Sequence, residues 1–382
     1  MNATAGATST SRLCRLLGQR YTPPFQHELP GTMAAMLEKE RLPQKLRENS
    51  KLLRRWFWLH LTGQARLLRD RLPPPPARLL WLSPSSNSIG DSVMELAGRA
   101  LLGAYEVDLL ADEFYADLYR SDRFLRRVIT DPAAIDPSHY DFGLQDFFNT
   151  RSLRIKRRVC PALPFATLQG FFAGADYNRL LFSCYRIHHL LGYPHTAQEL
   201  RSFLRPRLFL EDEPAPLPKE RGCQRVALAV GGKYPPRAYR QWPEAIRCLI
   251  TAWPSGEPWP EFVLIGSGNG WADAQAVSAA LGNRESKCFV DTLTLRATAR
   301  LLYDCDFFLG ADGGLMHCAL AANLPGVALF GRVRPSLRVP PETEMEALYD
   351  ANDVNNIAPQ AVAEAIRKRW FAAVRDGPEI SK

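Results

Sequence analysis

The stretch GADGGLMHCALAANLPGVALFG, residues 310–331, decides the fold of this 382-residue chain. Its first residue, Gly310, is also the last residue of DFFLG, residues 306–310. DFFLG is an apolar run typical of a strand buried on both faces of a parallel sheet. Glycines at 310, 313 and 314 then form a corner where the backbone can approach a ligand closely. A helix rich in small residues follows, and GVALFG predicts the next strand. We interpret the stretch as a strand–helix–strand unit of a parallel α/β sheet.

The start of the predicted helix in this stretch suits an anion such as pyrophosphate, because its first N–H groups are free and the helix dipole is positive there. Asp312 either caps that helix or accepts hydrogen bonds from sugar hydroxyls. His317 lies about one turn inside, where the dipole disfavours a charged imidazole, so it either makes a neutral hydrogen bond or packs. The motif is not a GxGxxG at the first strand of the chain, which argues against a dehydrogenase.

Composition indicates an ordinary water-soluble protein of two domains. Apolar residues make up 46% and charged residues 23% of the chain, and there is no run of 18 or more apolar residues to span a bilayer. The first 30 residues lack the apolar centre of a secretory signal. The eight cysteines are scattered without a CxxC pair, which favours reduced thiols, a cytoplasmic location and no metal site. The net charge of +8 suggests anionic partners, but no nucleic-acid motif is present.

Strands alternate with helices twice along the chain, on either side of a segment rich in proline and charge. This pattern predicts two doubly wound parallel sheets, with ligands in a cleft that the carboxyl ends of both sheets face. The sequence leaves open whether the last helix packs back on the first domain. The expected parts are an N-terminal extension (1–76), a first domain (77–205), a linker (206–222), a second domain (223–358) and a C-terminal helix (359–382).

The N-terminal extension is expected to be poorly ordered to about residue 35 and helical over 33–72. Leucines and Trp56 form an apolar stripe on that helix, and arginines supply a basic face. One interpretation is an interfacial helix, resting on an anionic membrane through residues 46–72. The other is a helix that packs on the main body by its aromatic side chains.

Two further loops follow the first strand of each predicted domain. In SPSSNSIGDSVME, residues 83–95, Gly90 and Asp91 stand where a loop becomes a helix. A carboxylate there is placed either to cap the helix or to deprotonate an acceptor hydroxyl. In VGGKYPPRAYRQWP, residues 230–243, two glycines allow close approach and the basic residues could neutralise a departing diphosphate. The candidate residues in this second loop are Gly232, Lys233, Arg237 and Arg240.

These three stretches, in this order, resemble the bacterial heptosyltransferase family, the ADP-heptose glycosyltransferases of lipopolysaccharide core synthesis. The matching motifs are Ile89-Gly90-Asp91, Arg240-Gln241-Trp242-Pro243 and Asp312 through His317 with Pro325 through Gly331. The resemblance covers roughly residues 77–375. It implies a GT-B fold of two Rossmann-like domains and the inverting transfer of a sugar from a nucleotide-diphosphate donor. The acceptor would be a hydroxyl of a glycan or lipid-linked glycan, and the enzyme would work at the inner face of the inner membrane.

The resemblance also implies roles for single residues. Asp91 inherits the place of the general base, on an acceptor-side loop with Ser88 and Gly90. Arg240 takes the place of a lysine that contacts the donor phosphates. The residues implicated in holding the nucleotide-sugar are Asp312, Gly313, Gly314, Leu315 and His317. Neither a cofactor nor a metal is expected.

The chain departs from the family pattern in three places. Gly313 stands where a hydroxyl residue is expected, Arg240 replaces a lysine, and a leader of about 75 residues precedes the first domain. Two other hypotheses about the function stay open. A nucleotide-sugar epimerase would form product from the donor alone, and a non-catalytic binding protein would bind nucleotide without turnover.

Overall fold

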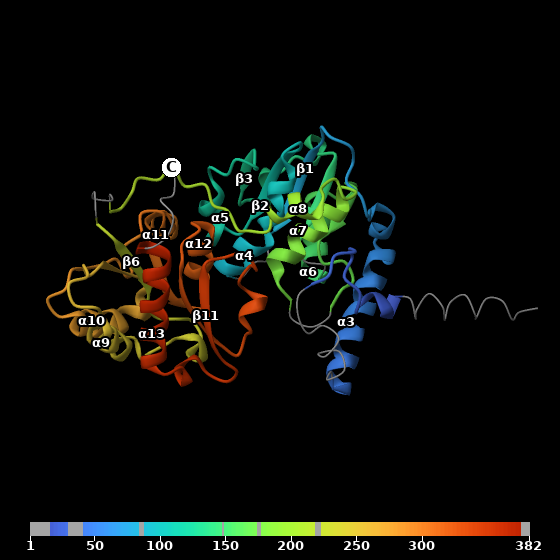
Figure 1. The fold of residues 1–382 in the computed structure, drawn as a ribbon. Coiled ribbons are helices and arrows are strands. Elements are labelled where there is room, and N and C mark those ends of the chain that lie inside the picture. Colours follow the sequence, from blue (N-terminus) through green and yellow to red (C-terminus); the bar gives the residue numbers. More distant parts are fainter. Residues whose placement is uncertain are drawn as a thin grey trace, which may run out of the picture. The chain divides into compact units, whose positions relative to one another are not determined.

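The computed structural model describes residues 16–29, 41–83, 88–146, 149–173, 177–217 and 223–375. The chain divides into two compact units. Unit 1 comprises Met1–Asn87 and Glu95–Leu204, and unit 2 comprises Ser88–Met94 and Arg205–Lys382. Each unit contains one parallel sheet with helices packed on it (Figure 1). The predicted class, two doubly wound α/β domains, is therefore confirmed.

Unit 1 has a five-stranded sheet in the order β3-β2-β1-β4-β5, in which all neighbouring strands run parallel. Strands β1 and β4 are neighbours although they are not consecutive, so the direction of winding reverses between them. In an open α/β sheet ligands bind at the carboxyl ends of the two strands at such a reversal. The strands are β1 (Arg78–Ser83), β2 (Glu106–Ala111), β3 (Arg127–Ile129), β4 (Phe142–Gln145) and β5 (Phe165–Thr167).

The helices of unit 1 are short, apart from the one in the N-terminal extension. Polar side chains cap several of them; Asn149 accepts from Ser152 N at the start of α6, and Asn178 accepts from Leu181 N at the start of α7. The helices are α3 (Leu42–Leu61), α4 (Ile89–Glu95, which belongs to unit 2 up to Met94), α5 (Glu113–Ala116), α6 (Thr150–Val159), α7 (Arg179–Leu190) and α8 (Ala197–Arg201).

Helix α3 is shorter than the predicted 33–72 helix. It spans Leu42–Leu61, with Pro43 in its first turn and Thr62 as its C-cap. Gly63 follows in the left-handed conformation, at a φ of 70°. Leu52 and Leu59 are buried, and Leu59 packs with Leu153 of α6 and Phe165 of β5. The helix therefore packs on unit 1, but mainly through leucines. Arg55, expected on the basic face, is buried instead.

Residues 16–29, which were expected to be poorly ordered, pack against unit 1. Phe25 forms a small aromatic cluster with Phe172 and Phe182. The buried guanidinium of Arg20 donates to the side chain of Asn49 on α3 at 3.0 Å. An aromatic ring and a hydrogen-bonded buried cation help to hold this polar, proline-broken segment in place. The other residues before 41 lie outside the described residues.

Unit 2 has a six-stranded parallel sheet in the order β11-β10-β9-β6-β7-β8. Numbered from β6, this is the strand order of a dinucleotide-binding sheet, with the reversal between β6 and β9. The strands are β6 (Arg225–Ala229), β7 (Glu261–Ile265), β8 (Ser286–Cys288), β9 (Phe307–Ala311), β10 (Gly326–Gly331) and β11 (Met345–Asp350).

Helices α9, α10 and α13 share one core cluster with the strands of unit 2 (Figure 1). The C-terminal helix α13 inserts Val362, Ile366 and Trp370 into that cluster, so it packs within unit 2. Its apolar positions recur three to four residues apart, which gives it one face to bury. The helices are α9 (Trp242–Ala252), α10 (Trp271–Leu281), α11 (Leu295–Leu302), α12 (Gly314–Ala321) and α13 (Pro359–Trp370).

The described part of the expected linker, residues 206–217, packs on unit 2. Arg296 at the start of α11 is buried and pairs with Asp212 and, at 3.1 Å, with Glu213. The hydroxyl of Tyr303 donates to the carbonyl of Leu208 at 2.8 Å. Among the helices that the structure describes, none is long and apolar enough to cross a membrane.

Candidate active site

Strand β9 leads directly into the corner that the sequence singled out. The backbone N–H of Asp312 donates to the carbonyl of Leu329 in β10 at 2.9 Å, and the Asp312 side chain is buried. The N-cap of α12 is Gly313, in extended conformation, and no described side chain caps the helix. The interpretation of Asp312 as the N-cap of this helix is therefore wrong. Within the described residues, the first N–H groups of α12 have no side-chain partner, and they lie at the carboxyl edge of the sheet, next to the β6–β9 reversal.

The buried carboxylate of Asp312 faces a cation. Nη1 of Arg237 lies 3.4 Å from Oδ2 of Asp312, and the Arg237 side chain is 34% exposed. The loop after β6 and the loop after β9 therefore meet, as their positions on neighbouring strands require. Arg237 was proposed as a phosphate contact; the structure places it where it can orient Asp312 while part of its guanidinium faces solvent.

The glycines after β6 allow a second close approach. Gly231 has a φ of 80°, and a Cβ atom there would lie 2.7 Å from Cα of Gly270. Gly270 ends the sequence Gly266-Ser267-Gly268-Asn269-Gly270, which follows β7 and leads into α10. This third glycine-rich corner is not among the predicted site residues, although its composition alone marks it. Gly232, a predicted donor contact, is exposed and packs closely on Ala238.

The backbone of Arg240 is fixed by a hydrogen bond, whereas its side chain is exposed. Its N–H donates to Oδ1 of Asn355 at 2.8 Å, which fixes the position of Cα. The guanidinium is 64% exposed, and Nη1 lies 4.0 Å from Oδ1 of Asp273 on α10. Lys233 is also exposed, with Nζ 5.7 Å from the ring centroid of Tyr234. The predicted helix after this loop is confirmed as α9, which has Pro243 in its first turn.

The segment that carries Asp91 packs against α12 inside unit 2. A Cβ atom on Gly90 would lie 2.6 Å from Cδ2 of His317, and one on Gly314 would lie 2.9 Å from Cβ of Ile89. Two glycines thus let α4 and the first turn of α12 approach more closely than any other residues could. His317 is buried, and its ring is covered by Gly90.

Ser88, not Asp91, caps helix α4. The backbone N–H of Asp91 donates to Oγ of Ser88 at 3.1 Å, so Ser88 serves one of the first N–H groups of the helix. Asp91 stands in the first turn, one residue beyond the Gly90 contact with His317, and is partly exposed. The structure therefore packs Ile89 and Gly90, which directly precede Asp91, against Gly314 and His317. Leu315, on the same turn of α12, is also partly exposed.

Residues 271–364, from α10 into α13, match the model of glycosyltransferase family 9 (heptosyltransferase). This segment includes the β9–α12 corner, so the resemblance drawn from the sequence is confirmed there. Together with the two parallel-sheet units, the match supports a glycosyltransferase. No curated protein matches the chain.

Solved structures of such enzymes share the fold. A family 9 glycosyltransferase from Veillonella parvula is 12% identical, with 80% of this chain and 100% of that chain covered and a TM-score of 0.60. The E. coli ADP-heptose lipopolysaccharide heptosyltransferase II is 18% identical, with 77% and 99% covered and a TM-score of 0.57. The E. coli heptosyltransferase WaaC, solved with ADP, is 16% identical, with 76% and 99% covered and a TM-score of 0.58. At these identities the likeness is one of fold, and it is of the GT-B type.

Proposed function

We propose that this protein is an inverting glycosyltransferase that moves a heptose or a related sugar from a nucleotide-diphosphate donor, ADP-heptose-like, to a hydroxyl of a glycan acceptor such as lipopolysaccharide core. The observation that carries the proposal is the close packing of the Asp91 segment on the first turn of α12. That segment carries a partly exposed carboxylate, and among the described residues no side chain caps the N–H groups of this turn. A base and an anion-binding helix end are the two groups that such a transfer needs.

Unit 2 supplies the donor site in this proposal. The diphosphate lies at the N-terminus of α12, where N–H groups that no described side chain caps donate to its oxygens. Asp312 accepts from sugar hydroxyls, with Arg237 beside it at 3.4 Å. The exposed guanidinium of Arg240 meets the outer phosphate. The support is positional, because the loops after β6 and β9 flank the reversal at which such sheets bind nucleotides.

The reaction is one in-line displacement. Asp91 takes the proton of the acceptor hydroxyl as its oxygen attacks the anomeric carbon from the face opposite the diphosphate. A new C–O bond forms, the bond from the anomeric carbon to the phosphate oxygen breaks, and the nucleoside diphosphate leaves with the electron pair. The configuration at the anomeric carbon inverts. Arg240 and the α12 N–H groups carry the charge that develops on the leaving group.

Neither a cofactor nor a metal is needed in this scheme. Within the described ranges, no group of three or more His, Cys, Asp or Glu side chains has the arrangement of a metal site. The proposal accordingly predicts that transfer persists in the presence of a chelator. Lasting inhibition by EDTA, relieved by a divalent cation, would contradict this part of it.

The test is transfer itself. The protein is incubated with ADP-heptose and a truncated lipopolysaccharide acceptor, and the product is analysed by mass spectrometry and by NMR of the new glycosidic linkage. We expect a product with inverted anomeric configuration. Conversion of the donor without an acceptor would favour the epimerase, and nucleotide binding without turnover under any acceptor would favour the binding protein.

We propose further that the enzyme works in the cytoplasm, at the inner face of the inner membrane, through α3. The face of α3 that does not pack on unit 1 exposes Leu46, Phe57 and Leu61, and Arg54 lies on the same helix. Exposed apolar side chains beside cations suit an anionic lipid surface. Vesicles with anionic lipid should sediment the wild type but not a variant with all three of these residues changed to Ser. Phe114→Ser, an exposed phenylalanine on α5, is the control and should bind like the wild type.

A further inference from the structure

Two helices of unit 1, α3 and α6, carry the positive charge of this chain. Together they contain ten lysines and arginines and a single acidic residue, Glu48, which gives the pair a net charge of +9. The net charge of all 382 residues is +8. The rest of the chain is therefore close to neutral, and its basic character is concentrated on these two helices rather than spread over the surface.

The arginines of α6 face solvent. Arg151, Arg154, Arg157 and Arg158 are all exposed, whereas Lys156 of the same helix is buried. Among the described residues, none of these four arginine side chains has a hydrogen bond or an ion pair. Four cations on one helix of ten residues are thus left without a counter-charge in the part of the chain that the structure describes.

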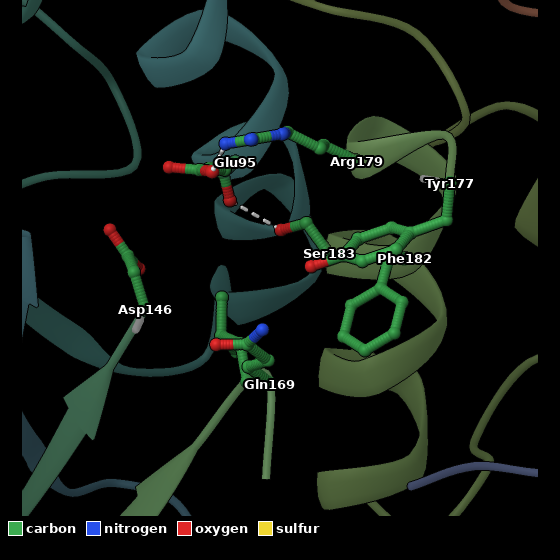
Figure 2. Close-up of a pocket in the computed structure, with 8 residues that line it drawn as sticks. Glu95, Asp146, Gln169, Tyr177, Arg179, Phe182 and Ser183 are labelled. Carbon is green, nitrogen blue, oxygen red and sulfur yellow. Dashed lines mark hydrogen bonds and ion pairs between the residues drawn. The ribbon is translucent and has the colours of Figure 1, made fainter. Parts of the chain in front are cut away.

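Other arginines of unit 1 do have carboxylate partners. Arg99 is buried with Asp122, and Arg179 is paired with Glu95, as Figure 2 shows. In both pairs the guanidinium is neutralised within the unit, and it helps to hold two elements together. The four α6 arginines differ from these, because no described carboxylate neutralises them.

The stability of α6 gives no reason for this arrangement. Arg151 lies in the first turn, where the positive end of the helix dipole disfavours a cation, and that turn has no acidic residue. Arg154 stands three or four residues from each of the other three arginines, and like charges at these spacings repel. Both effects disfavour the helix by itself, and an anionic surface beside it would offset them.

Helix α6 is fixed against α3, which exposes apolar side chains (Figure 1). Leu153 of α6 packs with Leu59 of α3, and Nζ of Lys156 donates to Oε1 of Gln64, just after α3, at 2.7 Å. Of the nine large apolar side chains that are exposed in the described part of the chain, four lie on α3: Leu42, Leu46, Phe57 and Leu61. Unpaired cations and exposed apolar side chains therefore occupy two helices that touch.

We propose that the four exposed arginines of α6 bind the head groups of anionic phospholipids, beside the membrane contact of α3. The inference rests on the proposed function, and it adds to the proposed membrane location the surface that selects anionic lipid. Guanidinium groups bind phosphate oxygens strongly, and an anionic leaflet attracts cations that lie near it. A nucleic acid would also neutralise the arginines, but it would leave the leucines and Phe57 of α3 in water. A lipid surface accommodates both.

The test is sedimentation of the full chain with vesicles of phosphatidylcholine, with or without phosphatidylglycerol, in low and in high salt. We expect the wild type to prefer the anionic vesicles and to bind them less tightly in high salt. One variant combines Arg151→Gln, Arg154→Gln, Arg157→Gln and Arg158→Gln. It should bind the anionic vesicles roughly 100-fold more weakly or worse, since each cation near such a surface contributes about five-fold. Lysine at the same four positions keeps the charge and should keep most of the binding.

A matched control separates this surface from net charge. It removes four exposed cations from other elements, through Arg120→Gln, Arg247→Gln, Arg334→Gln and Lys368→Gln, and should bind vesicles like the wild type. If the α6 glutamine variant does not fold, the double change Arg154→Gln with Arg158→Gln replaces it and should lose about 25-fold.

Sugar transfer to a truncated acceptor without membranes is measured on the same variants, and it reports on the transferase proposal separately from lipid binding. The inference is overturned if the wild type binds neutral and anionic vesicles alike, or if the folded glutamine variant binds like the wild type. An equal loss in the matched control would overturn it too, as would binding to a DNA oligonucleotide but not to vesicles.

Discussion

Gly90 of α4 lies directly against the imidazole of His317 on α12; a Cβ atom at residue 90 would be 2.6 Å from Cδ2 of that ring. His317 is buried, so its ring has little room to withdraw. This contact fixes how close the Asp91 segment comes to the helix end that is proposed to hold the donor. Gly90 therefore sets the position of the segment, and Asp91 supplies the carboxylate.

Gly90→Ala should push α4 away from α12. Overpacking of this kind costs about 1–3 kcal/mol of unfolding free energy, and displacement of Asp91 should lower kcat more than it raises KM. Denaturant titration and steady-state transfer measure the two effects. Gly103→Ala is the matched control, because Gly103 has helical backbone angles and nothing within 4 Å of its would-be Cβ. Equal behaviour of the two variants would show that the contact does not position Asp91.

Gly313→Thr should be tolerated and should tighten donor binding. The residue is exposed and extended, and the nearest atom to its would-be Cβ is the carbonyl oxygen of Ala311 at 3.7 Å. At an N-cap the exchange of Gly for Thr changes stability by only a few tenths of a kcal/mol. Calorimetric titration with ADP and GDP compares the affinities. A large fall in Tm, or weaker binding, would mean that glycine itself is required at this corner.

Arg240→Ala should weaken nucleotide binding about ten-fold or more without changing stability, since its guanidinium is 64% exposed and makes only a 4.0 Å contact with Asp273. Arg240→Lys should recover part of the loss, as a point charge replaces the planar fork. Arg247→Ala, on α9 and 59% exposed, is the control. Unchanged ADP affinity in Arg240→Ala would remove this residue from the donor site.

Stability should fall in acid because of the His27–His188 pair. Nε2 of His188 accepts from the backbone N–H of His195 at 3.1 Å, so its proton sits on Nδ1 and is donated to Nε2 of His27 at 2.9 Å. Burial, then the neighbouring His27 and His195, lowers the pKa of His188 to about 4. The unfolded state binds more protons between pH 6.5 and 4, so this pair's contribution is complete above pH 6.5 and is lost as pH falls toward 4.

Asp146, whose pKa burial raises to about 7, gives a slope of the opposite sign over part of that range. The informative quantity is therefore the difference between variants. His188→Gln should lose about 1–2 kcal/mol less than the wild type between pH 7 and pH 5. His139→Gln, at an exposed histidine, should follow the wild type. Parallel pH curves for all three proteins would contradict the assignment.

The sequence marks the fully buried strands well and several of the other strands badly. DFFLG and GVALFG predict β9 and β10, because strands covered on both faces are continuous apolar runs. Strands β3, β5 and β11 carry no such signal. The first two have three residues each, and β11 is a half-buried edge strand. Their pairing depends on a neighbour that the local sequence does not reveal.

The candidate site divides along similar lines. Glycine corners after buried strands can be found from composition, and Asp91 and Asp312 follow from their places beside them. Asp146 could not be found in this way, since LQD looks like the end of one strand and the start of a helix. Its burial and its hydrogen bond from Trp81 depend on the pairing of β1 with β4, which only the folded unit provides. Capping was equally undetermined; Ser88 and Gly313, not the two aspartates, occupy the caps.

The measurement that tests the central claim most directly is the rate of sugar transfer from ADP-heptose by Asp91→Asn. If Asp91 is the general base, the folded variant should bind ADP like the wild type and lose about 100- to 10,000-fold in kcat. Glu113→Gln, in the exposed first turn of α5, should keep full activity. Transfer by a folded Asp91→Asn at the wild-type rate would contradict the account.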